Sequence, residues 1–189
     1  MAFKKRLRSR LALYALAAVM GLAAAMSIAG VSSARANEPH GHAAAAPTTS
    51  ATIAVGGKVT TPLVLDAAAL AAMPRATVEA SAHGVEGEWS GVPLVEVLRA
   101  AGAPLGDALR GRNLALYVRI SAADGYRVVY ALAELDPKFR DDGVLLVDTH
   151  DGKPLDADSG PFRLVAPAEK RPGRWVRQVT RIDVLESAD

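Results

Sequence analysis

The 189-residue chain contains no cysteine. No disulfide can therefore hold it together, and its fold depends on burying apolar side chains. The first 36 residues have the layout of a signal peptide: a basic stretch from Lys4 to Arg10, an uncharged run from Leu11 to Ala29 rich in leucine and alanine, and the small-x-small pattern Ala34-Arg35-Ala36. Removing these 36 residues leaves 153, the size of one domain with a real core.

We expect cleavage after Ala36 and a periplasmic or secreted protein. The general secretion route is indicated, because Arg6, Arg8 and Arg10 are separated by single residues and form no twin-arginine pair. The alternative is an uncleaved leader, since its apolar run of about 19 residues is just long enough to span a bilayer. The membrane is expected as a partner only in that case.

The charge of the exported part argues against a nucleic-acid partner. The whole chain carries a formal charge of +2, but six of its 22 basic residues precede the expected cut and all 20 acidic residues follow it. The remaining chain is therefore net acidic, at −4. The basic isoelectric point belongs to the leader, and a nucleic-acid-binding surface is not predicted.

We predict that residues 37–51 form a disordered tether and that residues 52–187 form the folded domain. The tether is rich in alanine, proline and threonine and lacks bulky apolar side chains, so it cannot bury enough surface to become ordered. His40 and His42 lie within it. We interpret them as solvated histidines, because two ligands without a fixed third make a poor metal site.

Short strands outnumber short helices in the pattern of the domain. Leu114 to Ile120 alternates between apolar and other residues, and the Asp124-Gly125 turn leads into Arg127 to Leu132, which predicts a hairpin. Asp66 predicts the N-cap of a short helix, and Leu94 to Ala101 has apolar residues at helical spacing. These patterns predict a compact α+β domain with mixed β-sheet and short helices.

A cluster of five cations near the carboxyl end is the sharpest local signal. It contains no acid and consists of Lys170, Arg171, Arg174, Arg177 and Arg181. The spacing of apolar residues from Trp175 to Ile182 predicts a helix, on which three of the arginines share one face. Such a concentration in a net acidic domain predicts a site for an anion, for example a phosphate. The alternative is a solvated face with acids supplied by other loops.

Other groups of polar residues carry weaker signals. Ser81 and His83 lie on one side of a short strand, but no Gly-x-Ser-x-Gly motif surrounds a serine, so a hydrolase is not predicted. Glu86 and Glu88 are predicted in a loop. His150 is predicted in a turn. Four aspartates are interpreted as solvated turn acids and not as a calcium site, namely Asp148, Asp151, Asp156 and Asp158.

Four motifs then occur in a familiar order. They are Trp89-Ser90-Gly91-Val92-Pro93-Leu94, Ala123-Asp124-Gly125-Tyr126, Asp151-Gly152-Lys153-Pro154-Leu155 followed by Gly160-Pro161-Phe162-Arg163-Leu164-Val165 and Pro167, and Arg174-Trp175-Val176-Arg177. This series resembles the molybdopterin-binding domain of the sulfite oxidase family, and most of all its short, exported, stand-alone versions. The resemblance runs from about Ile53 to Leu185.

The resemblance implies a compact α+β fold with mixed sheets around a deep pocket for the pterin. It also implies molybdopterin as the cofactor. Arg163, Lys170 and Arg174 are then expected to face the anionic cofactor or substrate, and Tyr126 and Trp175 to pack at the pocket wall.

This chain departs from the family at the metal ligand. In the family's oxidoreductases a cysteine thiolate binds molybdenum, whereas here Ser81 or His83 stands roughly in its place. An unfolded chain passing through the general secretion route would also carry no cofactor with it. We therefore assign no metal ligand and expect a module that binds a small anionic or pterin-like ligand, or a partner protein, without conventional molybdenum redox chemistry.

Two alternatives stay open. The first is a molybdopterin-dependent oxidoreductase with non-cysteine ligation, working with a redox partner protein. The second is an exported structural domain without a small ligand. The sequence leaves open whether the protein is an enzyme.

Overall fold

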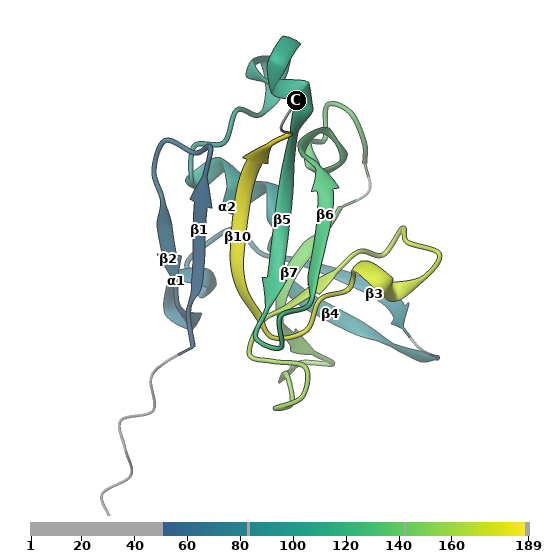
Figure 1. Ribbon diagram of the computed structural model, residues 1–189. Helices are drawn as coiled ribbons and strands as arrows, with labels where there is room; N and C mark the ends of the chain where they lie inside the picture. The colour runs from purple at the N-terminus through teal and green to yellow at the C-terminus, as the bar shows by residue number, and fades with distance from the viewer. Residues whose placement is uncertain (1–50, 83, 142, 188–189) are drawn as a thin grey trace, which may run out of the picture. The chain divides into compact units, whose positions relative to one another are not determined.

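Two β-sheets carry the fold in a computed structural model that describes residues 51–82, 84–141 and 143–187 (Figure 1). The expected leader, the tether with His40 and His42, and the candidate His83 lie outside these residues. The first sheet has the order β2-β1-β10-β5-β6. Its strands are β1 (Ile53–Gly57), β2 (Leu63–Leu65), β5 (Leu116–Ala122), β6 (Arg127–Ala131) and β10 (Val179–Glu186). β1 and β10 are parallel, and the other pairs are antiparallel.

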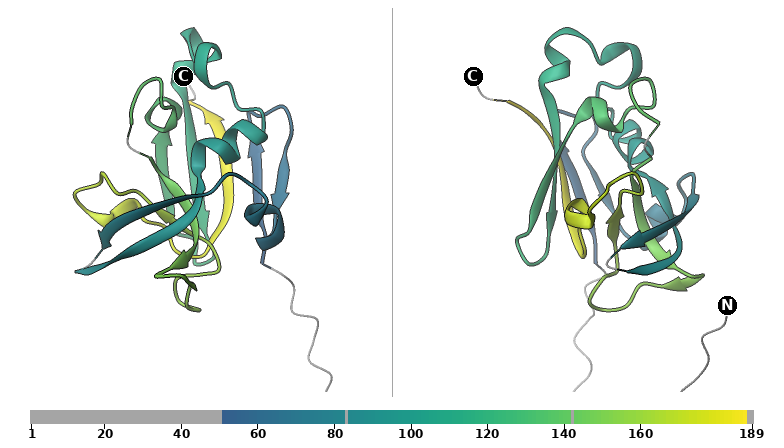
Figure 2. Two further views of the ribbon diagram at one scale, coloured as in Figure 1. Left: turned by 180° about the vertical axis from the view of Figure 1, so that it is seen from behind. Right: turned by 90° about the vertical axis from the view of Figure 1, so that its right-hand side faces the viewer.

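The second sheet is antiparallel and has the order β3-β4-β7-β8, with β9 also paired to β7. Its strands are β3 (Ala76–Ala82), β4 (Val85–Pro93), β7 (Leu145–His150), β8 (Lys153–Pro154) and β9 (Arg163–Val165). In the right-hand view of Figure 2 the two sheets lie on opposite sides of the interior. Both contribute to one buried cluster, with Val118 and Ile182 from the first sheet and Leu146 and Leu164 from the second.

The helices are short and lie between strands. They are the α-helices α1 (Ala67–Ala71) and α2 (Leu94–Ala100) and the 3₁₀ turns Gly106–Ala108, Gly111–Ala115, Leu132–Leu135 and Pro172–Arg174. Asp66 caps α1 by accepting a hydrogen bond from the Ala69 N–H at 2.8 Å, as its position predicts. α2 buries Leu94, Val97 and Leu98. The predicted α+β architecture with mixed sheets and short helices is confirmed.

The predicted helix between Trp175 and Ile182 is wrong. A 3₁₀ turn ends at Arg174, and β10 begins at Val179. β10 lies between β1 and β5, so hydrogen bonding to two neighbours and burial of Ile182 outweigh the local helical spacing. The arginines consequently do not share a helical face, and Arg181 pairs with Asp183 on its own strand, at 2.8 Å.

Two loop predictions and a strand boundary also need correction. Glu86 and Glu88 lie in β4, where Glu88 stands opposite Glu79 of β3. His150 is the last residue of β7. Leu114 is 48% exposed and lies in a 3₁₀ turn, because the buried side of β5 begins only at Leu116. Glu86 and Glu88 are paired with β3 in a local hairpin, whereas the place of His150 depends on pairing with β4, which is distant in the sequence.

Strands β4 and β7 approach each other closely at Gly91. The register between the two strands shifts between Ser90 and Gly91. A Cβ atom on Gly91 would lie 2.2 Å from the carbonyl oxygen of Leu146 and 2.4 Å from the Cα of Val147. Glycine is therefore required here by the space between two backbones. The shift also leaves Trp89 directly opposite His150.

Among the α- and 3₁₀-helices of the described ranges, none has the length and apolar character needed to cross a bilayer.

The carboxylate of Glu186, at the end of β10, is expected to make the stability of the protein depend on pH in the acid range. Hydrogen bonding from Arg112, followed by that from Lys58, lowers the pKa of Glu186 from 4.5 to about 2. Both cations lie 2.9 Å from its oxygens. A carboxyl with a lowered folded-state pKa stabilises the fold fully above its unfolded pKa, and this contribution disappears as the pH falls through the folded value.

We therefore expect Glu186→Gln to lower the melting temperature at neutral pH and to have a much smaller effect near pH 2. Melting temperatures of both proteins across this range, by circular dichroism at low salt, measure the effect. Because the groups are solvated, about 1 M NaCl should shrink the difference. A difference of equal size at both ends of the range would contradict the assignment.

Candidate functional site

A cavity of about 680 Å³ lies at the amino end of β9 and is here called the Arg163 pocket. Arg163 is only 9% exposed. Its guanidinium carbon lies 4.8 Å from the centre of the Trp89 ring and 5.8 Å from that of Trp175. The other polar and aromatic residues around the cavity include His150, Lys153, Asp156, Ser159 and Arg177. The pocket thus combines aromatic surfaces with positive charge.

The aromatic wall is built from two strands of the second sheet and from the chain between β9 and β10. The rings of Trp89 on β4 and His150 on β7 stack at 3.9 Å and 18°, and Trp175 meets Trp89 edge-on at 5.9 Å. The Trp89 indole donates to the carbonyl of Ala80 at 3.2 Å, and the Trp175 indole to that of Ala166 at 2.9 Å. Each indole is therefore fixed by a contact with another ring and by a hydrogen bond.

His150 fits against β4 only because residue 87 is glycine. A Cβ atom on Gly87 would lie 2.2 Å from the His150 Nε2. That nitrogen is buried and has no hydrogen-bond partner among the described residues, although the Oδ2 of Asp151 lies 3.7 Å away. The Oδ1 of Asp151 instead accepts the Glu88 N–H at 2.9 Å and ties the loop after β7 to β4.

Arg163 is a buried cation without a carboxylate partner. Within the described residues no carboxylate lies within ion-pair distance, its Nε has no hydrogen-bond partner, and its Nη1 reaches only the Ser159 hydroxyl at 3.4 Å. Burial is the main cause that lowers the pKa of Arg163, and the charge of Arg177 lowers it further, against an opposing effect of Asp156. An unpaired buried charge is unfavourable, so this site favours an anion.

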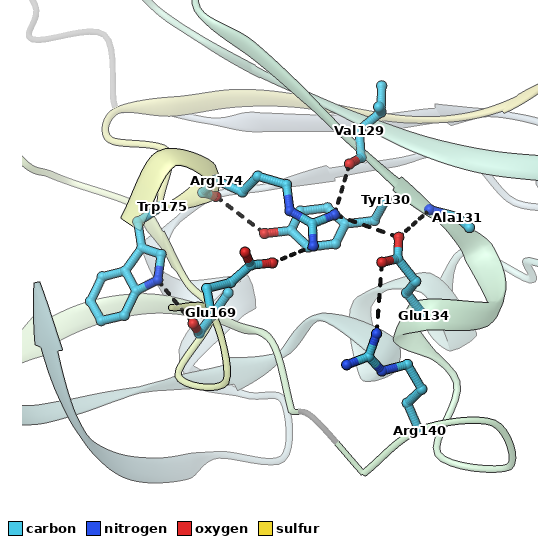
Figure 3. Close-up of polar contacts among 9 residues, drawn as sticks. Val129, Tyr130, Ala131, Glu134, Arg140, Glu169, Arg174 and Trp175 are labelled. Carbon is cyan, nitrogen blue, oxygen red and sulfur yellow. Dashed lines mark hydrogen bonds and ion pairs between the residues drawn. The ribbon is translucent and has the colours of Figure 1, made fainter. Parts of the chain in front are cut away.

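A second cavity, of about 420 Å³, is lined by Lys170 and Arg174 and is here called the Arg174 cavity. Arg174 lies 4.0 Å over the Tyr130 ring and forms ion pairs with Glu169 and Glu134 (Figure 3). Its Nη1 also donates to the carbonyl of Val129 at 3.2 Å. The two cavities share no lining residue. The structure therefore brings Arg163 and Trp175 together and places Lys170 and Arg174 elsewhere.

The remaining candidates of the sequence lie away from both cavities or outside the described residues. Ser81 is exposed near the end of β3, opposite Glu86. Tyr126 is 50% exposed and donates its hydroxyl to the Gly173 carbonyl at 2.7 Å. His83 is not among the described residues. Neither Ser81 nor Tyr126 lines the Arg163 pocket or the Arg174 cavity.

Sequence reasoning missed most residues of the Arg163 pocket, among them Trp89, His150, Lys153 and Ser159. Local patterns gave no signal for His150, because its contact with Trp89 depends on the β4–β7 register. The aspartates nearby are also engaged: Asp148 forms a two-bond pair with Arg75, and Asp156 accepts the Ser159 N–H. The interpretation as a solvated turn acid is wrong for Asp148, which lies in β7 and pairs with Arg75, whereas Asp156 is exposed and bonds within its own turn.

The residues of the Arg163 pocket fit the organic part of a pterin cofactor but supply no metal ligands. The buried charge of Arg163 and the indoles beside it suit a flat anionic molecule. The whole chain has no cysteine, and no group of three or more His, Asp or Glu residues in the described ranges could hold a metal ion. We therefore derive no step that runs through a protein-bound metal.

Comparison with known proteins identifies the fold and the family of the chain. The fold resembles that of the crystal structure of the sulfane dehydrogenase SoxCD from Paracoccus pantotrophus, with a TM-score of 0.58 and 22% sequence identity. The match covers 73% of this chain and 39% of that one, so the chain spans well under half of the SoxCD chain. No curated protein matches the sequence. Residues 40–189 match the family described as the oxidoreductase molybdopterin binding domain, and the chain belongs to that family.

Proposed function

We propose that the Arg163 pocket binds a small anion with a flat, pterin-like ring and that the protein serves as a binding module without conventional molybdenum redox catalysis. The observation that carries the proposal is the Arg163 guanidinium, which is buried beside two indoles and has no carboxylate partner among the described residues. An anionic ligand would remove the cost of this unpaired charge.

The contacts of the pocket define how such a ligand is held. The guanidinium of Arg163 lies at the wall of the cavity, where Arg177 and Lys153 add positive charge. The fixed rings of Trp89 and Trp175 offer apolar surface and exclude water from the guanidinium. Charge-assisted hydrogen bonds to a guanidinium are the strong ones, so affinity should depend on the ligand's charge.

A second candidate function is that of a molybdopterin-dependent oxidoreductase with non-cysteine ligation. Membership of the molybdopterin-binding family favours it. In that case the cofactor would supply electron-transfer chemistry, and the pocket residues would bind and orient it. The protein would then also need a redox partner protein.

We also propose export through the general secretion route, on the strength of the basic, apolar and Ala-x-Ala segments within residues 1–36.

The proposed function is tested by titration with 6-carboxypterin, followed by NMR of the two tryptophan indole N–H groups. Both tryptophans of the chain line the Arg163 pocket, so both signals should shift on binding. Uncharged pterin should bind about tenfold more weakly than the carboxylated compound. Equal affinities for the two compounds, or unchanged indole signals, would overturn the anion-site assignment.

Analysis of the protein recovered from the cells that make it separates the two candidates. We expect less than about a tenth of an equivalent of molybdenum, because no thiolate is present to hold it. Near-stoichiometric molybdenum would support the oxidoreductase instead. Mass spectrometry of the same sample should find Asn37 at the amino terminus, whereas an intact leader would contradict cleavage.

A further inference from the structure

The Arg174 cavity lies at the opposite end of β9 from the Arg163 pocket. Arg163, the first residue of β9, lines one cavity, and Ala166, just beyond its last residue, lines the other. Trp175 faces the Arg163 pocket, and its indole is bonded to the carbonyl of Ala166. The cavity of about 420 Å³ falls within the size range of sites for small organic ligands.

One wall of the Arg174 cavity is rigid, and its charged side chains form ion pairs with one another (Figure 3). Arg174 is held by Glu169, by Glu134 at 3.5 Å, by the Val129 carbonyl at 3.2 Å and by stacking on Tyr130. Glu134 is fixed in turn, because it accepts the Ala131 N–H at 2.8 Å. Arg140 approaches the other oxygen of Glu134 at 3.9 Å. Both carboxylates of the cavity are therefore already engaged by arginines.

The charge that remains is positive. Lys170 and Arg171 also line the cavity, are exposed, and form no hydrogen bond or ion pair with any residue in the described ranges. They follow directly after Glu169, so both lie on the same loop beside the neutralised wall. Among the described lining residues, four cations face two carboxylates, which leaves an excess of two positive charges.

The rest of the lining is apolar. The Tyr130 ring, Val144 and Ala166 are buried, and Ala168 completes this surface. We propose that the Arg174 cavity is a second binding site, for a small organic dianion with an apolar body, of the aromatic dicarboxylate class. The ring would pack on the apolar surface, and the two carboxylates would pair with Lys170 and Arg171. This proposal is independent of the ligand of the Arg163 pocket.

The test uses phthalate as the probe and methyl NMR of the full chain labelled at alanine. Phthalate should shift the methyl signals of Ala166 and Ala168 in a saturable way and leave the two tryptophan indole signals unchanged. Benzamide, which has the ring without the charge, and sulfate, which has the charge without the ring, should each bind about tenfold more weakly. Shifts of the indoles alone would place phthalate in the other pocket and overturn the proposal.

A matched pair of variants completes the test. The double variant Lys170→Gln/Arg171→Gln should weaken phthalate binding about tenfold, because both residues are exposed and their loss leaves the fold intact. Arg163→Gln should leave phthalate binding unchanged while it weakens binding of 6-carboxypterin. Unchanged phthalate affinity in the double variant, or no saturable binding to the parent protein, would refute the second site. Neither result would bear on the pterin experiment, so the two proposals can fail separately.

Discussion

Replacing Arg163 with methionine is expected to remove binding of 6-carboxypterin and yet leave the fold at least as stable as before. The two effects have opposite signs because the guanidinium is buried without a carboxylate partner. Methionine fills similar space beside Trp89 and Trp175 and carries no charge that must be desolvated. A group that serves only stability would behave differently, since its removal would destabilise the protein.

The expected loss of affinity is about 30- to 100-fold, which corresponds to about 2–3 kcal/mol for a charge-assisted hydrogen bond in a desolvated site. The free energy of unfolding in urea should stay the same or rise by about 1 kcal/mol. Calorimetric titration and urea denaturation measure the two quantities on the same preparations.

Arg177→Gln is the matched control for this prediction. Arg177 lines the same pocket but is exposed, so its loss should weaken binding only about threefold and change stability by less than about 0.5 kcal/mol. If Arg163→Met destabilised the fold by several kcal/mol, or bound the carboxylated pterin as the parent does, Arg163 would be a structural residue and the ligand assignment would fail.

Gly91→Ala should destabilise the protein by about 2–4 kcal/mol, an unusually large effect for the addition of one methyl group. The new Cβ would meet the Leu146 carbonyl oxygen at 2.2 Å and the Val147 Cα at 2.4 Å. Both contacts are backbone, so β4 and β7 must separate to admit it. The separation would also disturb the stacking of Trp89 on His150, because the register shift at Gly91 sets their alignment.

Gly173→Ala is the control with the same chemical change. Gly173 has a negative or extended φ, and nothing lies within 4 Å of its added Cβ. Its stability should change by less than about 0.5 kcal/mol. Urea denaturation gives both values, and the Trp89 indole signal in NMR should move only in the Gly91 variant. Similar stabilities for the two variants would show that β4 and β7 have room to adjust.

Much of the fold could be predicted wherever a local pattern also determines burial. The alternation along β5 and the apolar face of α2 identify those elements, because each pattern matches the face that packs on the core. The segment from Trp175 to Ile182 shows the limit. Its apolar residues also suit a helix, and only pairing with β1 and β5, which lie far away in the sequence, makes its second half a strand.

The candidate site could be predicted only in part, for a similar reason. Charge and resemblance both singled out arginines and lysines near the carboxyl end. They could not show that β9 separates these residues into two cavities, with Arg163 in one and Arg174 and Lys170 in the other. The stacked His150 depends on a single shift in register, which no local pattern of residues reports.

The side chains around Arg174 have one more consequence, which concerns self-association. β6 is the outermost strand of its sheet, and its backbone could in principle pair with a strand from another molecule. Arg174 already donates a hydrogen bond to the carbonyl of Val129, and Glu134 accepts one from the N–H of Ala131. Both backbone groups belong to β6. At these two positions the backbone of β6 is therefore already bonded, and a foreign strand could pair with it there only by displacing an arginine and a glutamate.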